Sequence, residues 1–326
     1  MKSKILLFSA LVLLLGTAFI SCKKDPTDIK LNKSTLVLTK GKTVTLTATI
    51  YPKNADKSVT WTTSDSKVVT VEEGVVTAIA LGKATISVTT KVGNFKAECL
   101  IIVIEPIEPE MVVVEGGPFT MGCTDGDCFD NNELPAHQVT LNSFKIGKYE
   151  IRQEEWLSVM DYIPVQWYNG VDYPVEYISR DEVQKFIQTL NEATGKNYRL
   201  PTEAEWEFAA RGGNKSKRYK YSGSNNVDEV AWYSNPDLGP KKVGGKSPNE
   251  LGIYDMSGNV YEFCSDWFGD YTGIPQINPS GPSTGTYLVL RGGAYSSEEQ
   301  FCRIAARRFL LPNEKGSNIG FRLVLP

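Results

Sequence analysis

The chain has very few histidines: His137 is the only one in 326 residues. A metal centre held by several imidazoles, such as a non-haem iron site, is therefore excluded, because one histidine cannot supply its ligands. The chain also lacks a block of lysine and arginine, and its 35 basic and 38 acidic side chains give a formal net charge of −3. This balance lacks the basic footprint that nucleic acids need, so we expect no nucleic-acid partner.

Long apolar runs are scarce as well. Residues 5–20 form an apolar run that is shorter than most membrane-spanning helices and stands where a secretory signal would stand. It ends in the sequence Phe-Ile-Ser-Cys at residues 19–22, which resembles the lipobox of bacterial lipoproteins, with phenylalanine where leucine is commonest. The resemblance implies a signal peptide over residues 1–21 and lipidation of Cys22. The alternative is an uncleaved N-terminal anchor with an incidental cysteine.

A short charged tether follows the predicted lipidation site. Residues 22–27 include Lys23, Lys24 and Asp25, which resemble the surface-export signal of Bacteroidetes lipoproteins. The resemblance implies an outer-membrane lipoprotein that is held to the membrane by its lipid anchor and exposed at the cell surface. The alternative is a solvated tether that stays in the periplasm.

Residues 28–105 contain short stretches that alternate polar and apolar residues, with glycines between them. Such stretches predict strands with one buried face, and several at this spacing predict an all-β antiparallel sandwich. The predicted strands are residues 43–50, 58–62, 68–71, 75–79 and 84–89.

The segment Val59-Thr60-Trp61, followed by residues 68–71, 74–78 and 82–86, resembles the bacterial Ig-like group 2 (BIG2) domain. The resemblance places Trp61 in the core and implies a spacer, with an adhesion element as the alternative. The next residues, 106–110, contain two prolines and predict a stiff, extended linker.

Residues 111–326 have a different texture, with loops rich in glycine and aromatic residues. Ser179 and Glu182 predict a capping box before a helix that ends at Gly195. Thr202 begins a second helix, with Glu205 at the matching position of its own box, and residues 153–160 predict an earlier helix. The texture predicts a mixed α+β domain with much irregular structure.

The block Tyr-Arg-Leu-Pro-Thr-Glu-Ala-Glu-Trp-Glu-Phe-Ala-Ala-Arg-Gly-Gly at residues 198–213 resembles the formylglycine-generating-enzyme family, also called the sulfatase-modifying-factor family. The resemblance implies an α+β, loop-rich fold of the C-type-lectin type for residues 111–326. We also expect four arginines to hold loops together through carboxylates and carbonyls: Arg291, Arg303, Arg307 and Arg322. Further matching blocks are residues 114–122, 135–141, 249–267, 290–294 and 318–322.

The family's oxidases hold Cu(I) with two thiolates, which suit a soft ion. Here Ala294 replaces the family's serine after Arg-Gly-Gly, and Ser297 stands where the first thiolate is expected. A hydroxyl cannot replace a thiolate on Cu(I), and Cys302 is closer to the following arginines than the family's second cysteine. We therefore expect no copper and assign no catalytic residue. The alternative is a copper-dependent formylglycine-generating oxidase that activates sulfatases.

Some relatives with this fold use the segment after Arg-Gly-Gly as a variable binding surface. A mixture of aromatic, small and charged side chains suits recognition better than redox chemistry, so we expect a non-catalytic, lectin-like module with a protein or glycan ligand. A solvated loop and a structural subunit of an envelope machine are the alternatives. The candidate ligand-binding residues are Tyr295, Ser296, Ser297, Glu298, Glu299, Gln300 and Phe309.

Residues 255–262 resemble a calcium loop of the family. The resemblance implies a structural calcium ion held by the carboxylates of Asp255 and Glu262 and the carbonyls of Gly258 and Val260, since Ca²⁺ prefers oxygen ligands. The alternative is a plain turn in which Asp255 caps a backbone amide.

Five cysteines remain if Cys22 is lipidated, and an exported chain would carry disulfides. Cys123 and Cys128 enclose a four-residue loop that a local disulfide could close. The family resemblance implies a second pair, Cys264 with Cys302, for which a metal-binding thiol pair is the alternative. Cys99 is left over, and we expect it to be buried on the last strand of the Ig-like domain.

Overall fold

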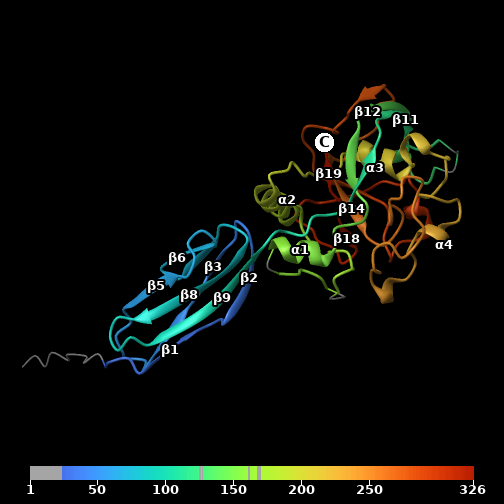
Figure 1. Ribbon diagram of the computed structural model, residues 1–326. Coiled ribbons are helices and arrows are strands. Elements are labelled where there is room, and N and C mark those ends of the chain that lie inside the picture. The colour runs from blue at the N-terminus through green and yellow to red at the C-terminus, as the bar shows by residue number, and fades with distance from the viewer. Residues whose placement is uncertain (1–23, 125, 127, 161, 167–169) are drawn as a thin grey trace, which may run out of the picture. The chain divides into compact units, whose positions relative to one another are not determined.

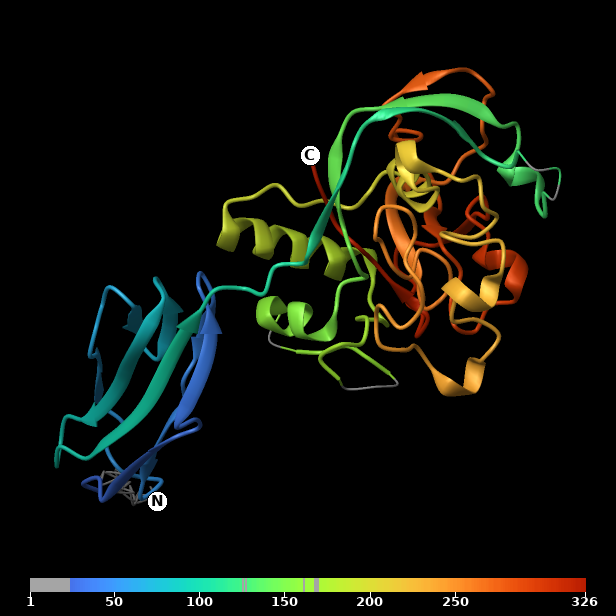
Figure 2. The same cartoon turned by 45° about the vertical axis from the view of Figure 1, so that its right-hand side comes forward.

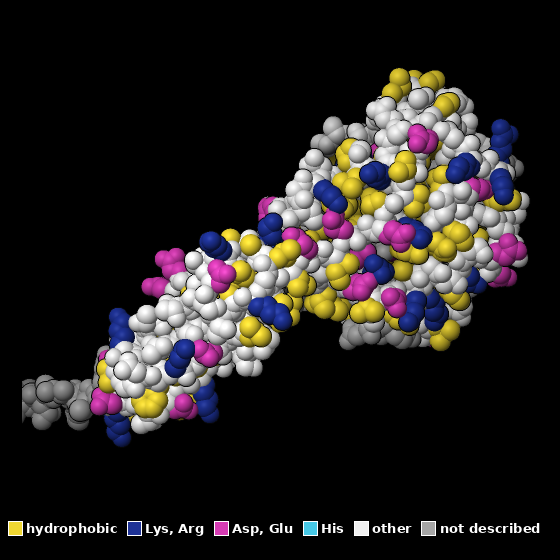
Figure 3. Space-filling view, in the orientation of Figure 1, with side chains coloured by type: hydrophobic (Ala, Val, Ile, Leu, Met, Phe, Trp, Pro, Cys, Tyr) yellow, Lys and Arg dark blue, Asp and Glu magenta, His cyan; other side chains and the backbone are white. Residues whose placement is uncertain are grey.

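The computed structural model describes residues 24–124, 126, 128–160, 162–166 and 170–326, and the predicted lipidation site Cys22 lies outside them. Most of residues 24–102 form one unit and residues 103–326 belong to another. Within the described ranges, none of the helices combines the length and the apolar character needed to span a membrane. Figure 3 shows basic and acidic side chains interspersed on the face in view, without a block of either sign.

The first unit is the expected all-β sandwich (Figure 1). One sheet has the strand order β2-β9-β8-β5, another has the order β3-β7-β6, and β1 pairs with β4. Val76, Ile86 and Ile101 lie fully buried in it. The strands are β1 (Asp28–Leu31), β2 (Thr35–Thr39), β3 (Thr43–Thr45), β4 (Ala48–Tyr51), β5 (Val59–Thr63), β6 (Val69–Glu72), β7 (Val75–Ala78), β8 (Gly82–Thr90) and β9 (Lys96–Ile104).

The predicted strand at residues 43–50 is wrong in one respect, because the chain changes sheet in its middle. The Leu46 amide donates to the Gly74 carbonyl at 2.8 Å, beside β7, whereas the Thr47 amide donates to Asn32 Oδ1 at 2.9 Å. Two neighbouring residues thus bond in opposite directions, and the run divides into β3 and β4. Trp61 is partly buried against the core of this unit, and Cys99 is buried on β9 as expected.

The second unit is a loop-rich α+β domain, as the sequence predicts. Among the residues described, its strands form three small sheets, ordered β17-β16-β14-β18, β10-β13-β19 and β11-β12-β15. In Figure 2 the short strand β15 runs along β12, with which it pairs in parallel. The elements are β10 (Met111–Val114), β11 (Gly117–Met121), β12 (His137–Leu141), β13 (Phe144–Gly147), α1 (Gln153–Met160), α2 (Arg180–Thr194), α3 (Glu203–Ala210), α4 (Val227–Val230), β14 (Tyr261–Trp267), β15 (Gln276–Ile277), β16 (Leu288–Arg291), β17 (Arg308–Leu310), β18 (Ile319–Gly320) and β19 (Val324–Leu325), with short 3₁₀ turns at Asn131–Glu133, Gly213–Lys215, Pro236–Leu238 and Glu299–Cys302.

Both predicted capping boxes are confirmed. The Ser179 hydroxyl accepts from the Glu182 amide, and the Glu182 carboxylate accepts from the Ser179 amide, at the start of α2. Thr202 and Glu205 do the same for α3. Gly195 ends α2 with φ of 71°, a conformation that glycine adopts without strain.

Helix α3 is buried along its whole length, although three of its eight residues are glutamates. Burying a carboxylate is costly unless it is paired and hydrogen-bonded. Glu207 pairs with Arg291 and Arg211, and Glu203 pairs with Arg307. The prediction that arginines hold loops through carboxylates is therefore confirmed, and two of these pairs connect α3 to the end of β16 and to the residue before β17.

Candidate functional site

The segment after Arg-Gly-Gly is folded into the interior rather than displayed. Tyr295 is 3% exposed and Ser297 is 8% exposed. The Tyr295 amide donates to the Asn259 carbonyl at 2.7 Å, and its carbonyl accepts from the Asn235 amide at 2.7 Å. The Ser297 carbonyl accepts from the Ser234 amide at 2.8 Å. The prediction that Tyr295 and Ser297 face a ligand is wrong, because both residues are structural.

Ser297 has a defined structural task at the position where the oxidases carry a thiolate. Its hydroxyl accepts from the Ala294 amide and donates to the Tyr261 hydroxyl, both at 3.0 Å. The hydroxyl therefore closes the turn after Arg-Gly-Gly and ties it to β14. The residue at which the family resemblance led us to expect a thiolate thus supplies hydrogen bonds that hold the backbone.

The other five candidate binding residues are more exposed than Tyr295 and Ser297. Glu298 and Glu299 are exposed and Gln300 is half-buried, and Glu299 accepts from the Tyr221 hydroxyl at 2.5 Å. Ser296 is half-buried and its hydroxyl accepts from the Asn318 amide group at 3.1 Å. Phe309 lies on β17, is 46% exposed, and packs at 4.8 Å against both Phe268 and Tyr287.

The predicted disulfide between Cys264 and Cys302 is wrong, whereas the Cys123–Cys128 disulfide is present. Cys264 packs in the core beside α3, and Cys302 packs in a different cluster with Tyr221, Val227, Val230 and Ala231. Two sulfurs in separate clusters cannot bond.

Burial also keeps both thiols protonated. Burial raises the pKa of Cys302 to about 12, with the Glu299 charge adding to the effect. Burial likewise raises the pKa of Cys264, and the charge of Asp266 raises it further. Both residues are therefore protonated thiols near neutral pH in the metal-free chain.

The predicted calcium ligands are only partly brought together. Both oxygens of Glu262 accept from Arg322 at 2.6 Å, and one also accepts from Trp206 Nε1 at 2.8 Å. A carboxylate held by a guanidinium does not fit as a cation ligand. Asp255 accepts from the Gly244 amide at 2.6 Å, as in the plain-turn alternative, and burial raises its pKa to about 6.

Glu150 is a buried carboxylate that sequence reasoning missed at this turn. It accepts from the Val260 amide at 3.1 Å and from the Asn259 side chain at 2.6 Å. Burial raises its pKa well above the usual range, and the charges of Asp255 and Glu262 raise it further. Among the described residues no set of three or more acidic, histidine or cysteine side chains is arranged to hold a metal ion.

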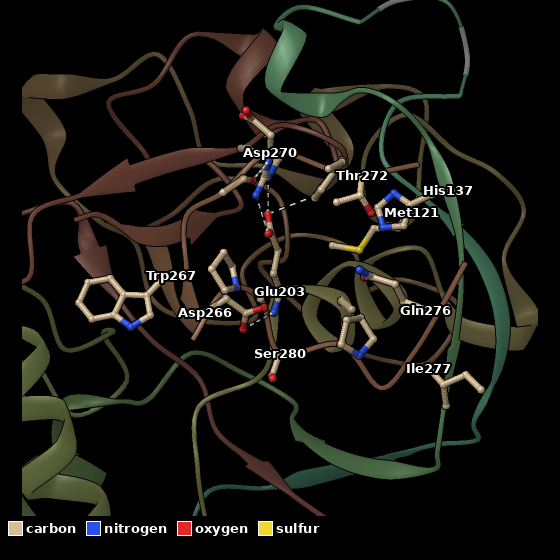
Figure 4. Close-up of a pocket in the computed structure, with 17 residues that line it drawn as sticks. Met121, His137, Glu203, Asp266, Trp267, Asp270, Thr272, Gln276, Ile277 and Ser280 are labelled. Atoms are coloured by element: carbon tan, nitrogen blue, oxygen red, sulfur yellow. Dashed lines mark hydrogen bonds and ion pairs between the residues drawn. The ribbon is translucent and has the colours of Figure 1, made fainter. Parts of the chain in front are cut away.

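A cavity of about 500 Å³ lies beside the loop that follows β14. None of its lining residues belongs to the predicted binding segment at residues 295–300. Figure 4 shows Glu203 at its centre, with Asp266 on one side and His137 and Met121 on the other. The Trp267 indole extends away from Glu203 in the same view. The lining residues are Met121, His137, Glu203, Ala204, Asp266, Trp267, Gly269, Asp270, Tyr271, Thr272, Gln276, Ile277, Pro279, Ser280, Gly281, Pro282 and Arg307.

An ion pair forms the rigid wall of this cavity. Arg307 Nε and Nη2 donate to the two oxygens of Glu203 at 2.6 and 2.8 Å. Arg307 Nη1 donates to the carbonyls of Asn132 and Gly269, and the guanidinium lies over the Tyr271 ring at 4.0 Å. All three nitrogens of this arginine are engaged by the protein itself.

Two titratable side chains stand at the same cavity. Asp266 is 5% exposed, and its Oδ2 accepts from the Glu203 amide at 3.0 Å and from the Ser265 hydroxyl at 2.9 Å. Burial raises the pKa of Asp266 to about 7, and the Glu203 charge contributes. His137 Nδ1 lies 3.2 Å from the Pro135 carbonyl, which can only accept, so Nε2 is the acceptor of the neutral ring.

Sequence reasoning missed this cavity because its lining is assembled from distant segments. Its outer wall is residues 270–282, which contain three prolines and few apolar residues and carry no motif. A long polar loop directly after a family motif was the available signal, since loops on a rigid scaffold often carry function.

Two family models match separate parts of the chain. Residues 26–101 match the bacterial Ig-like domain (group 2), and residues 104–326 match the sulfatase-modifying factor enzyme 1-like domain. The second match covers more than half of the chain.

Individual relatives agree with that match. The chaperone protein LppX of Paenibacillus barcinonensis is 34% identical over 67% of this chain and 90% of its own length. The formylglycine-generating enzyme of Thermomonospora curvata is 28% identical over 67% of this chain and 94% of its own length. The solved structure of Treponema denticola variable protein 1 aligns with a TM-score of 0.61 and 27% identity over 73% of this chain and 98% of that one. The chain therefore belongs to the family of the sulfatase-modifying factor enzyme 1-like domain, carried behind a bacterial Ig-like domain of group 2.

Proposed function

We propose that the C-terminal domain is a non-catalytic, lectin-like binding module, and that the chain is a surface-exposed lipoprotein of the outer membrane, anchored through Cys22. The proposal of a non-catalytic module depends on the contacts of Ser297 and Cys302, the residues at which copper ligands would be expected. Ser297 is hydrogen-bonded into the turn, and Cys302 is a buried thiol with a raised pKa. These side chains do not offer the two thiolates that hold Cu(I).

The relatives support a role other than oxidation. Alongside formylglycine-generating enzymes, the matching proteins include one named a chaperone and one named a variable protein. One fold thus serves several purposes in this family, and the residues at the site decide which applies. The Ig-like domain acts as the spacer of the proposed lipoprotein.

A structural calcium ion at residues 255–262 belongs to the same proposal, with a changed ligand set. Asp255 and Glu150 supply the carboxylates, with the carbonyls of Gly258 and Val260, while Glu262 stays on Arg322. Thermal unfolding in calcium and in EDTA tests this: calcium raises the Tm of the wild-type chain and of E298Q, but not of E150Q. Equal Tm values in both buffers for the wild-type chain would contradict it.

A turnover assay tests the absence of oxidase activity. The full chain, loaded with Cu(I), is incubated under oxygen with a peptide that carries the Cys-x-Pro-x-Arg sulfatase motif. The Thermomonospora curvata enzyme, treated in the same way, serves as the positive control. We expect the peptide mass to remain unchanged with this chain. Conversion of the peptide thiol to an aldehyde would overturn the proposal and restore the copper-dependent oxidase.

A further inference from the structure

The cavity beside residues 266–282 has features of a ligand site that the family's oxidase chemistry does not use. We propose that it binds a neutral saccharide, which rests on the proposed function of the domain as a binding module. Its volume of about 500 Å³ lies within the range of small-molecule pockets, about 300–1,000 Å³.

The charges at the cavity exclude an anionic ligand. Arg307 is the basic side chain of the lining, and its nitrogens already donate to Glu203 and to two backbone carbonyls. Glu203, Asp266 and Asp270 contribute acidic groups to the same wall. A phosphate or carboxylate would therefore meet repulsion without a free cation to hold it.

Polar groups that can hydrogen-bond to hydroxyls remain available. Within the described part of the chain, the side chains of Asp270, Gln276 and Ser280 make no hydrogen bond, and of the two Asp266 oxygens only Oδ2 is bonded. In Figure 4 Asp266 lies to the left of the cavity's centre, Ser280 below it and Gln276 to its right. Carboxylate, amide and hydroxyl groups both accept from and donate to sugar hydroxyls.

Apolar groups border the same opening. Ile277 is 76% exposed, and Pro279 and Pro282 line the cavity on the same loop. A sugar ring presents hydroxyls at its edge and C–H groups on its faces, so it matches a wall that alternates polar and apolar groups. A purely apolar ligand would leave Asp266 Oδ1 without a partner, which is costly in a buried carboxyl.

Binding measurements on the full chain in a detergent without a sugar headgroup test the assignment. The probes are glucose, galactose, mannose and N-acetylglucosamine with their β-linked trimers, and the comparison ligands are glucose 6-phosphate, sialic acid and lysine amide. We expect at least one neutral saccharide to bind and the anionic ligands not to bind. Stronger binding of lysine amide than of every saccharide, or no binding in the neutral panel, would overturn the proposal.

Variants locate the site. We expect D266N to lower the affinity for the bound saccharide at least tenfold and Q276A or S280A to lower it several-fold. D237N, the same substitution at an exposed position outside the cavity lining, is the matched control and keeps the affinity of the wild-type chain. Unchanged affinity in both D266N and Q276A would place the sugar elsewhere and overturn the assignment. If the sulfatase peptide stays unreacted and no sugar binds, the saccharide assignment is wrong, but the proposal of a non-catalytic binding module is not contradicted.

Discussion

The segment at residues 294–302 and the loop at residues 269–286 differ in nearly every respect that matters for recognition. In the first, Tyr295, Ser297 and Cys302 are buried. In the second, residues 272–278 and 280–287 are exposed throughout. The first is the place where the family's oxidases bind copper, and the second carries no family motif. The contrast shows that a position inherited from a catalytic family can become part of the core while free polar groups gather elsewhere.

The largest effect that sharpens this contrast is on thiol reactivity. Because the pKa of Cys302 rises to about 12 from an ordinary value of 9.0, its thiolate is about 1,000-fold scarcer at neutral pH than in the unfolded chain. We expect iodoacetamide to modify Cys302 at least that much more slowly in the folded chain than in guanidinium chloride, as followed by peptide mass spectrometry. A disulfide-linked Cys264–Cys302 peptide, or equal rates of Cys302 modification in the folded and unfolded chains, would contradict the burial of Cys302 as a free thiol.

Removal of one aromatic ring from each region is the next test. Tyr295→Ala empties a buried site, so we expect a loss of about 3–5 kcal/mol in the free energy of unfolding. Phe309→Ala removes a half-exposed ring that stacks on two neighbours, and we expect a loss of about 1 kcal/mol. Urea unfolding measures both variants, and similar losses would show that Tyr295 is not a core residue.

The pH dependence of stability tests the buried acid of the cavity. Asp266 has a folded pKa of about 7, above the ordinary 3.8, so the folded chain keeps this proton while the unfolded chain has lost it. Its contribution to the free energy of unfolding therefore falls by about 1.4 kcal/mol for each pH unit between about pH 4 and about pH 7. Above about pH 7 the contribution stays constant.

The matched variant isolates this contribution. In D266N the side-chain oxygen still accepts the same two hydrogen bonds, but it carries no charge. We expect D266N to be more stable than the wild-type chain at pH 8 and to lose that advantage at pH 4, by urea unfolding. A difference between the two chains that does not change with pH would contradict the raised pKa.

The last comparison makes the same substitution once in each region, and it includes the smallest expected effect. Ser297→Ala leaves the buried Ala294 amide and the Tyr261 hydroxyl without their partner, and we expect a loss of about 1–3 kcal/mol. Ser280→Ala removes an exposed hydroxyl and changes the free energy of unfolding by less than about 0.5 kcal/mol. Equal effects in urea unfolding would mean that the two regions are not as different as their contacts indicate.

Much of the fold could be predicted because its signals are local. The capping boxes at Ser179 and Thr202 depend on residues three positions apart, and both helices begin where those pairs predict. The alternating strands of the Ig-like domain are equally local. The strand break at Leu46 could not be predicted, because it depends on partners that are distant in the sequence, near Gly74 and Asn32.

Of the candidate site, the sequence predicted only the lack of a thiolate at residue 297. The replacement of a thiolate by Ser297 was visible as a residue type, but the burial of Tyr295 and Ser297 depends on Asn259, Ser234 and Asn235, which no motif joins to them. The separation of Cys264 from Cys302 depends on which core cluster each side chain enters. The cavity was missed for the same reason, because His137, Glu203 and Asp266 meet only in three dimensions.

Hydrogen–deuterium exchange of the full chain, read by mass spectrometry, tests the contrast between the two regions most directly. In residues 294–302 the amides of Tyr295, Ser297 and Phe301 donate to backbone carbonyls, whereas most of residues 269–286 is exposed loop. We expect the first segment to exchange far more slowly than the second, and a bound saccharide to slow the second alone. Fast exchange in residues 294–302, with protection of residues 269–286 in the free protein, would contradict the assignment of structure to one region and binding to the other.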